Sequence, residues 1–294
     1  MESKPSTQTI SFEDRYQIGE QLWLDGPHAG WLALDRLMQR EVIMNIPYRP
    51  EDNERFISGV QSQARLRHQN LVPIYDFNCT SDDKPFFTIP YLKMISLKDF
   101  RDSTSESTFP QQIRFLQQIC GALSFLHANN LLHLSLSPSH VLISQPLQEV
   151  YLQQNLQRQI AANDPTEEQL GTPGMISGVP FYMAPEQSNP SRLGELSVET
   201  DIFGLGGILY YILYGNPPNM GDYKDSVGHT DFINLLASRK GPPGKGKLRF
   251  TGRAHRKLAK RLEPICQRAL HSDRSKRHCD ASEFSQDLTN AFIG

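Results

Sequence analysis

The sequence predicts an α+β protein with two lobes, a small β-rich lobe followed by a larger helical one. Strand-like segments are concentrated before residue 92 and helix-like segments dominate after it, as expected when the two kinds of element are segregated. The segment 202–214 contains no charged residue and places apolar side chains all round the helical period, so it predicts a helix buried on every side. With 294 residues the chain is long enough to give both lobes a core.

The small lobe is expected at residues 15–92, after a flexible lead-in at 1–14. Apolar runs separated by turn-forming residues predict strands at 16–23, 30–36, 40–46, 70–77 and 85–92. The segment 51–66 contains helix-forming polar residues and begins with acidic ones, which predicts a helix.

The large lobe is expected at residues 93–294. Apolar periodicity predicts its helices at 110–128, 202–214, 257–271 and 280–293. Short β-like segments lie at 133–144 and 149–153, and the polar segment 157–179 predicts a loop. Thr200 and Asp201 are residue types that cap a helix N-terminus, and Gly215 ends the apolar helix.

Composition excludes several classes of protein. The net charge of −2 provides no general attraction to nucleic acid, and no apolar run is long enough to span a membrane. Four scattered cysteines (Cys79, Cys120, Cys266 and Cys279) have no metal-binding spacing and suit a reducing compartment. The first residues lack the apolar core of a signal peptide, so a cytoplasmic location is expected. The basic segment 239–261 is either a solvated surface loop or a site for an anion or an acidic partner.

The motif FYMAPEQ at 181–187, together with the apolar helix at 202–214, resembles part of a known family. It is similar to the end of the activation segment and the central helix of eukaryotic-like Ser/Thr protein kinases, particularly bacterial ones. The resemblance extends over residues 15–292. It implies a bilobal protein-kinase-like fold, in which active members transfer phosphate from ATP with the help of Mg²⁺.

The nucleotide-binding positions of the family are replaced in this sequence. Counted from Tyr16, the three glycines of the Gly-rich loop correspond to Trp23, Asp25 and His28, and the following valine corresponds to Gly30. An acidic Asp25 above a triphosphate would repel it.

The strand after this loop differs from the family pattern in the same way. Its lysine, which binds the phosphates, is replaced by Asn45, and its alanine, which contacts adenine, is replaced by Ile43. The helical glutamate that would hold the lysine is replaced by Gly59. No lysine occurs between Lys4 and Lys84, so only Arg36, Arg40 or Arg49 could take over this charge.

The catalytic loop corresponds to residues 133–140. The catalytic Asp is replaced by Ser135, the Lys by Ser137 and the metal-binding Asn by His140. The Asp of the D-F-G motif, the principal Mg²⁺ ligand of the family, is replaced by Gln154. No Asp or Glu occurs from residue 107 to residue 148 to supply a displaced base.

The residues that hold the family fold are retained. The resemblance implies a buried ion pair between Glu186 and Arg277 and assigns Asp201 to the backbone of the catalytic loop, with His133 in the core. Residue types alone also allow a metal pair at His133 and His140, or a hydrolase nucleophile at Ser135 or Ser137. Both are weaker hypotheses than packing, because no acidic residue lies in the loop to orient a base.

These replacements predict a pseudokinase, a kinase-like signalling domain that transfers no phosphate and needs no cofactor or metal. It would act as a scaffold or regulatory module by binding protein partners. The alternative is an atypical Ser/Thr kinase or nucleotidyl transferase that binds ATP with displaced residues. A Mg²⁺-dependent nucleotide site would separate the two hypotheses.

Overall fold

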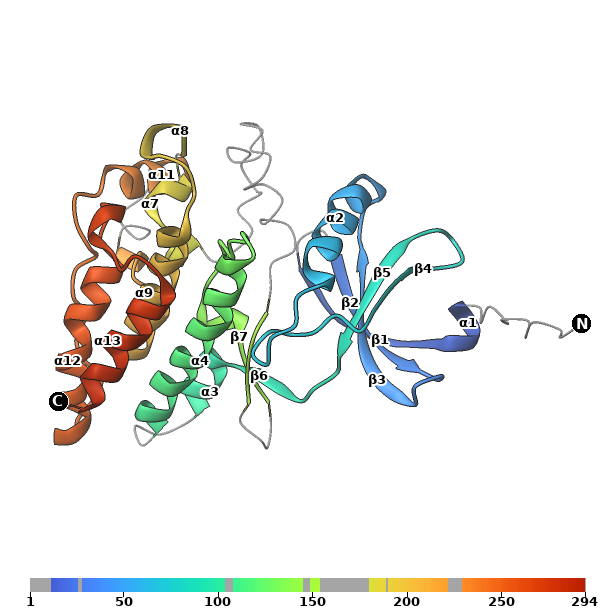
Figure 1. Cartoon of the computed structure of the whole chain (residues 1–294), viewed down its shortest axis with the longest axis horizontal. Helices are drawn as coiled ribbons and strands as arrows, with labels where there is room; N and C mark the ends of the chain where they lie inside the picture. The colour runs from blue at the N-terminus through green and yellow to red at the C-terminus, as the bar shows by residue number, and fades with distance from the viewer. Residues whose placement is uncertain are drawn as a thin grey trace, which may run out of the picture. The chain divides into compact units, whose positions relative to one another are not determined.

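The structure is a computed structural model in which the described residues are 12–25, 28–103, 108–144, 149–153, 180–188, 190–221 and 229–293. The chain divides into two units (Figure 1). The first unit comprises Met1–Arg67 and Val72–Leu92, and the second comprises His68–Leu71 and Lys93–Gly294. Within the described ranges no helix is both long and apolar enough to cross a membrane.

The first unit is built on a five-stranded antiparallel sheet with the strand order β1-β2-β3-β5-β4. Its elements are α1 (Phe12–Arg15), β1 (Tyr16–Asp25), β2 (His28–Asp35), β3 (Arg40–Pro47), η1 (Pro50–Asp52), α2 (Asn53–Ala64), β4 (Asp76–Cys79) and β5 (Pro85–Pro90). Strand β3 is central, and its residues 42–45 are all buried. This explains the continuous apolar run in its sequence, since a strand covered on both faces needs no polar alternation.

The start of the first unit differs from the sequence expectation. Helix α1 begins at Phe12, inside the expected lead-in at 1–14, and residues 1–11 lie outside the described ranges. The Phe12 ring lies 5.2 Å from the Phe86 ring and 5.8 Å from the Tyr16 ring. This aromatic contact provides the burial that orders the segment.

The predicted strand at 70–77 is also wrong over most of its length, because β4 begins at Asp76. Asn70 instead donates a hydrogen bond from Nδ2 to the Val150 carbonyl, 2.8 Å away, and Leu71 bridges Leu152. Pro73 has no N–H to donate to a strand partner, which interrupts the segment before the sheet begins.

The second unit is mostly helical, with a three-stranded antiparallel sheet in the order β6-β7-β8. Its first elements are β6 (Met94–Ser96), α3 (Leu97–Ser103), α4 (Phe109–Ala128), η3 (Pro138–His140), β7 (Val141–Ser144) and β8 (Val150–Leu152). The remaining elements are η4 (Pro180–Tyr182), α7 (Pro185–Ser188), α8 (Pro190–Leu193), α9 (Val198–Tyr214), α11 (His229–Ser238), α12 (Arg253–Ala269), η5 (Arg274–Lys276) and α13 (Ala281–Ile293). Figure 1 shows α12 and α13 side by side, next to α9. The sequence patterns missed β6, α3 and α11.

Helix α9 is the apolar helix predicted from the sequence. Every residue from Thr200 to Tyr214 is buried, so the prediction of a helix covered on all sides is confirmed. The expected N-cap is wrong: the helix begins one turn earlier, with Ser197 as N-cap and Thr200 completing a capping box. Gly215 ends the helix with φ of 92°, a left-handed conformation that glycine adopts without steric cost.

Three glycines of α9 allow other elements to approach its backbone closely. A Cβ atom at Gly204 would lie 2.6 Å from Leu136 Cβ, one at Gly206 would lie 2.7 Å from Ala269 Cβ, and one at Gly207 would lie 2.9 Å from the Tyr182 ring. These partners come from the segment before η3, the end of α12 and η4. Helix α9 therefore acts as the support on which the catalytic-loop segment 133–140 rests.

Candidate functional site

The β3 positions that bind nucleotide in the family lie in the interior of the first unit. Ile43 pairs with Leu32 on β2 and Ile89 on β5, and Asn45 pairs with Gly30 and Phe87. Ile43 is 6% exposed and Asn45 is 2% exposed.

The side chain of Asn45 carries an unsatisfied donor. Its Nδ2 atom is buried and has no hydrogen-bond partner among the described residues. A buried amide nitrogen without an acceptor is costly, because it loses its hydrogen bonds to water and gains none in return.

The Gly-rich loop positions form a hairpin of directly paired strands. Trp23 pairs with Gly30, and Asp25 pairs with His28, where β2 begins. The side chains of Trp23 and Asp25 lie outside what the structure describes, so their effect on a phosphate stays a prediction. His28 is partly buried, with its ring 6.3 Å from the Phe56 ring.

Gly59 lies in α2, at the position of the family's helical glutamate. It is buried, and its carbonyl accepts a hydrogen bond from Ser62 Oγ at 2.8 Å. Because glycine has no side chain, α2 presents no carboxylate at this position.

In the second unit, Asp201 organises the backbone of the catalytic-loop segment. Its carboxylate accepts hydrogen bonds from the His133 N–H at 2.7 Å and the Leu134 N–H at 2.6 Å. The His127 ring adds a third contact through Nε2 at 2.9 Å. Leu134 has φ of 58°, which an L-residue rarely adopts. The two charge-assisted bonds from Asp201 stabilise this strained backbone.

The His133 side chain is buried and hydrogen-bonded at both nitrogens. Nδ1 accepts the Ser135 N–H at 3.3 Å, which leaves Nε2 to donate to the Gln153 carbonyl at 2.9 Å. Burial lowers the pKa of His133, so the ring is neutral, as this pattern requires. A ring with both nitrogens occupied is a core element, and it offers no lone pair to a metal.

Three further polar side chains of the catalytic-loop segment are Ser135, Ser137 and His140. Ser137 is fully buried, and its Oγ lies 3.0 Å from Nδ1 of His140. Burial and the neighbouring His133 lower the pKa of His140 to about 4, so its ring is neutral at pH 7. The Ser135 hydroxyl is buried without a partner in the described ranges.

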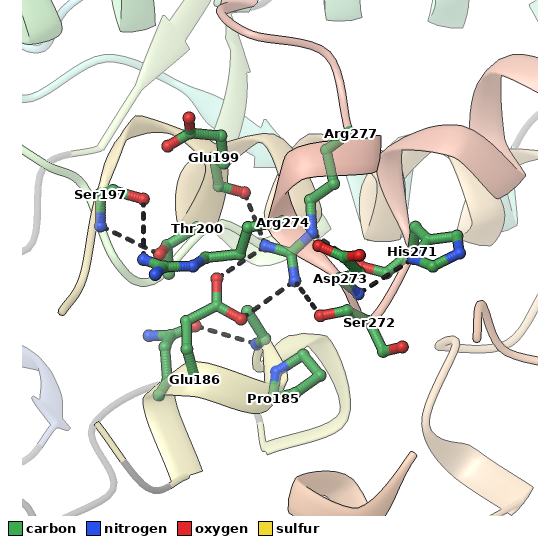
Figure 2. A network of polar contacts seen from close by, with 12 residues as sticks. Pro185, Glu186, Ser197, Glu199, Thr200, His271, Ser272, Asp273, Arg274 and Arg277 are labelled. Carbon is green, nitrogen blue, oxygen red and sulfur yellow. Dashed lines mark hydrogen bonds and ion pairs between the residues drawn. The ribbon is translucent and has the colours of Figure 1, made fainter. Parts of the chain in front are cut away.

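Glu186 of α7 and Arg277 after η5 form a bidentate ion pair, with N–O distances of 2.6 and 3.0 Å. Arg277 also donates to the carbonyls of His271, Glu199 and Ser272, so all five of its N–H groups are used (Figure 2). Its guanidinium carbon lies 5.0 Å from the centre of the Phe203 ring. The network fastens α7 to α9.

Sequence reasoning missed two residues that hold this loop. Gln187 donates from Nε2 to the Leu134 carbonyl at 2.8 Å and accepts the Ala184 N–H at 3.0 Å. His127, at the end of α4, contacts Asp201. A polar residue after the APE sequence was a signal for Gln187, but nothing local to His127 indicated its partner.

Part of the expected site cannot be placed. Gln154, at the position of the metal-binding Asp, and the expected loop at 157–179 lie outside the described residues. The second unit therefore brings together His133, Ser135, Ser137 and His140, and the first unit brings together Gly30, Ile43 and Asn45.

The chain is similar in sequence to characterised protein kinases along nearly its whole length. The protein kinase domain family matches residues 43–288. The serine/threonine-protein kinase PknB of Mycobacterium tuberculosis is 26% identical over 289 residues, which cover 96% of this chain and 43% of PknB. The DNA damage-responsive serine/threonine-protein kinase RqkA of Deinococcus radiodurans is 30% identical over 231 residues, covering 76% of this chain and 33% of RqkA. The chain thus spans less than half the length of these relatives.

A solved structure shows the same fold. The kinase domain of Mycobacterium tuberculosis PknI superimposes with a TM-score of 0.66 and 18% identity, covering 94% of this chain and 96% of the PknI domain. The expected α+β kinase-like fold, with a β-rich first unit and a helical second unit, is confirmed. The chain belongs to the protein kinase domain family, of the type found in bacterial serine/threonine kinases.

Proposed function

We propose that this chain is a catalytically inactive member of the kinase family that acts as a protein-binding or regulatory module. The observation that carries the proposal is the catalytic loop. At the positions of the family's Asp, Lys and Asn stand Ser135, Ser137 and His140, and the last two bond to each other at 3.0 Å.

These side chains do not fit the chemistry of phosphoryl transfer, which needs a base near the accepting hydroxyl and ligands for Mg²⁺. A serine hydroxyl is no base at neutral pH, and Ser137 is fully buried. His140 is neutral because its pKa is lowered to about 4, and Mg²⁺ prefers oxygen ligands over imidazole. The residues at these positions therefore do not fit Mg²⁺-ATP.

The first unit supports the same proposal. Asn45 provides no cation for the phosphates, and it is only 2% exposed to solvent. Gly59 provides no carboxylate to hold one. Ile43 is larger than the alanine that the family places against adenine, and it is buried, with 6% exposure, on a strand paired on both sides.

The retained contacts support a role in binding. The Glu186–Arg277 pair and the Asp201 bonds keep the second unit ordered, while charged groups of catalysis have been replaced. A fold that is kept while its catalytic groups are replaced fits a domain that works through its surface, because function depends on the site and not on the fold. The partner would be a protein.

The competing function is an atypical kinase or nucleotidyl transferase. It is supported by the similarity of the chain to PknB and RqkA, both of which are named serine/threonine-protein kinases. That function would require displaced groups to replace a lysine, a base and a metal carboxylate.

Two measurements separate these functions. In a phosphotransfer assay with labelled ATP, Mg²⁺ or Mn²⁺ and generic protein substrates, we expect no transfer. Any transfer should be measured again across successive purification steps of the intact chain, since a contaminating kinase would separate from it. Activity that persists in a contaminant-free sample would refute the proposal.

The second measurement is thermal melting with millimolar Mg²⁺-ATP. A ligand at a hundred times its dissociation constant stabilises a protein by about 2.7 kcal/mol, which is a visible shift. We expect none. A saturable, Mg²⁺-dependent shift would favour the competing function.

Repair of the motifs extends the test. Restoring the family residues with Asn45→Lys, Ser135→Asp, His140→Asn and Gln154→Asp should still give no kinase activity, because Ile43 remains in the nucleotide position. Activity in this variant would show that charge loss alone had silenced the domain.

A further inference from the structure

The first half of helix α12 carries an exposed stripe of positive charge. Arg253, Arg256, Lys257 and Lys260 are all exposed. Their spacing of i, i+3, i+4 and i+7 places them on one face of the helix. The opposite face is fixed in the core through its buried residues, which are Ala259, Leu262, Cys266 and Ala269.

The stripe is unpaired in the part of the chain that the structure describes. None of its four side chains makes an ion pair or a side-chain hydrogen bond there. At the other end of the same helix, Arg268 pairs with Glu283 at 2.6 Å and Asp287 at 3.3 Å. Acidic residues of α13 thus balance the positive charge near the C-terminus of α12, whereas the positive charge near its N-terminus is not balanced by any described residue.

The surrounding sequence increases this charge. The segment 239–261 contains no Asp or Glu, and Lys240 and Lys247 before the helix are also exposed. Helix α12 has no acidic residue in its first turn, and its N-cap, Gly252, provides no side-chain cap.

Helix stability does not account for this arrangement. Like charges at i, i+4 repel each other, as in the pairs Arg253–Lys257 and Arg256–Lys260. Cations near a helix N-terminus also oppose the helix dipole, which favours acidic residues there. Both effects are unfavourable in the free protein, and an anionic partner would reverse both.

We propose that this stripe, Arg253–Arg256–Lys257–Lys260, is a docking surface for an acidic polypeptide segment of a partner protein. Its length is about 10 Å at 1.5 Å per residue, which matches a few consecutive residues of an extended acidic segment. The opposite charges would also speed the encounter between the partners. The proposal goes beyond the inactive-kinase function and does not depend on it.

Other anionic partners fit the stripe less well. Insertion into a lipid surface needs apolar side chains beside the cations, but the apolar face of α12 is buried against α9 and α13. Single-stranded nucleic acid is held by aromatic stacking as well as charge, and α12 contains no Phe, Tyr or Trp. The net charge of −2 also gives no general attraction to a polyanion.

The test uses one variant that separates binding from folding. Arg253→Glu/Arg256→Glu reverses half of the stripe and creates two Glu–Lys pairs at i, i+4 in the favoured orientation. It also places two acids in the first turn. The matched control, Lys84→Glu/Lys98→Glu, changes two exposed lysines outside α12 and alters the net charge equally.

The probe is a fluorescein-labelled peptide of alternating Glu and Gly, followed by fluorescence anisotropy at low and physiological salt. A Gln–Gly peptide is the neutral reference. We expect the acidic peptide to bind the natural chain and the control, and to bind the α12 variant at least about tenfold more weakly. The melting temperature of the α12 variant should be equal or higher.

Four outcomes would overturn the proposal. The first is that the acidic peptide does not bind the natural chain at low salt, and the second is that it binds all three proteins equally. Alternatively, phosphatidylserine-containing vesicles or an oligonucleotide could bind through the stripe while the peptide does not, which would assign the stripe to another class of partner. A lower melting temperature of the α12 variant would show that the four cations serve the fold.

Discussion

The strongest test of the fold is removal of the buried Arg277 side chain. Arg277 has 0% side-chain exposure and Glu186 has 2%, so neither charge is solvated in the native state. Arg277→Ala leaves the Glu186 carboxylate buried without its partner and removes the Arg277 donor from three carbonyl groups. Breaking a buried ion pair by removing one partner costs about 3–5 kcal/mol.

That loss is a large fraction of the total stability of a domain, which is about 5–15 kcal/mol. Urea unfolding should be followed by far-UV circular dichroism, which reports on helices. Tryptophan fluorescence is unsuitable because Trp23 and Trp31 both belong to the first unit, whereas the ion pair lies in the second.

Arg268→Ala is the matched control. Arg268 also pairs with acidic residues, but its side chain is 40% exposed, so the expected cost is below about 1 kcal/mol. The double variant Arg277→Ala/Glu186→Ala should be no less stable than Arg277→Ala alone, because it leaves no buried charge without a partner. A cost below about 1 kcal/mol for Arg277→Ala, or simple additivity in the double variant, would refute the reasoning.

Three further predictions concern the loop, the central helix and the sheet. The pKa of His140 is lowered to about 4, so as the pH falls below about 6.5 this histidine takes up a proton in the unfolded chain before it does in the folded one, and the free energy of unfolding should drop by roughly 1–3 kcal/mol towards pH 4. In urea titrations at several pH values, His140→Gln should make this decrease smaller. An unchanged pH profile in the variant would contradict the prediction. Gly204→Ala should lower stability by about 1–3 kcal/mol through its clash with the loop, whereas Gly121→Ala, with no atom nearer than 4.0 Å, should raise it by about 0.5–1 kcal/mol in the same urea assay. Asn45→Leu should leave the melting temperature equal or higher, since it removes an unpaired buried amide, and a clear decrease would reveal a hydrogen bond there.

The main elements of the fold could be predicted from local patterns. An uncharged run at 202–214 was sufficient to identify α9, because a helix that is apolar all round is stable in water only when it is covered. Strand β3 and helix α4 were predicted for the same kind of reason, since periodicity and side-chain type act over a few neighbouring residues. The resemblance at FYMAPEQ then located the loop positions by counting along the chain.

Local patterns failed where several neighbouring residues were equally suitable. The sequence offers three residues that can cap a helix, Ser197, Thr200 and Asp201. In the folded chain the Asp201 carboxylate accepts hydrogen bonds from the catalytic-loop segment instead, and Ser197 is the N-cap. The helix at Phe12 could not be predicted from its neighbours, because the Phe12 ring packs against a residue far along the chain, Phe86.

The chemistry of the loop was only half visible in the sequence. The residue types at 135, 137 and 140 followed from counting, and with them the absence of a carboxylate. The backbone turn at Leu134, in contrast, is held by Asp201, at a separation of 67 residues. Likewise, Arg277 reaches Glu186 and the Glu199 carbonyl across 91 and 78 residues, which only the folded chain brings together. Propensity and periodicity are properties of neighbouring residues, whereas hydrogen-bond partners and burial depend on which distant segments the packed core brings together.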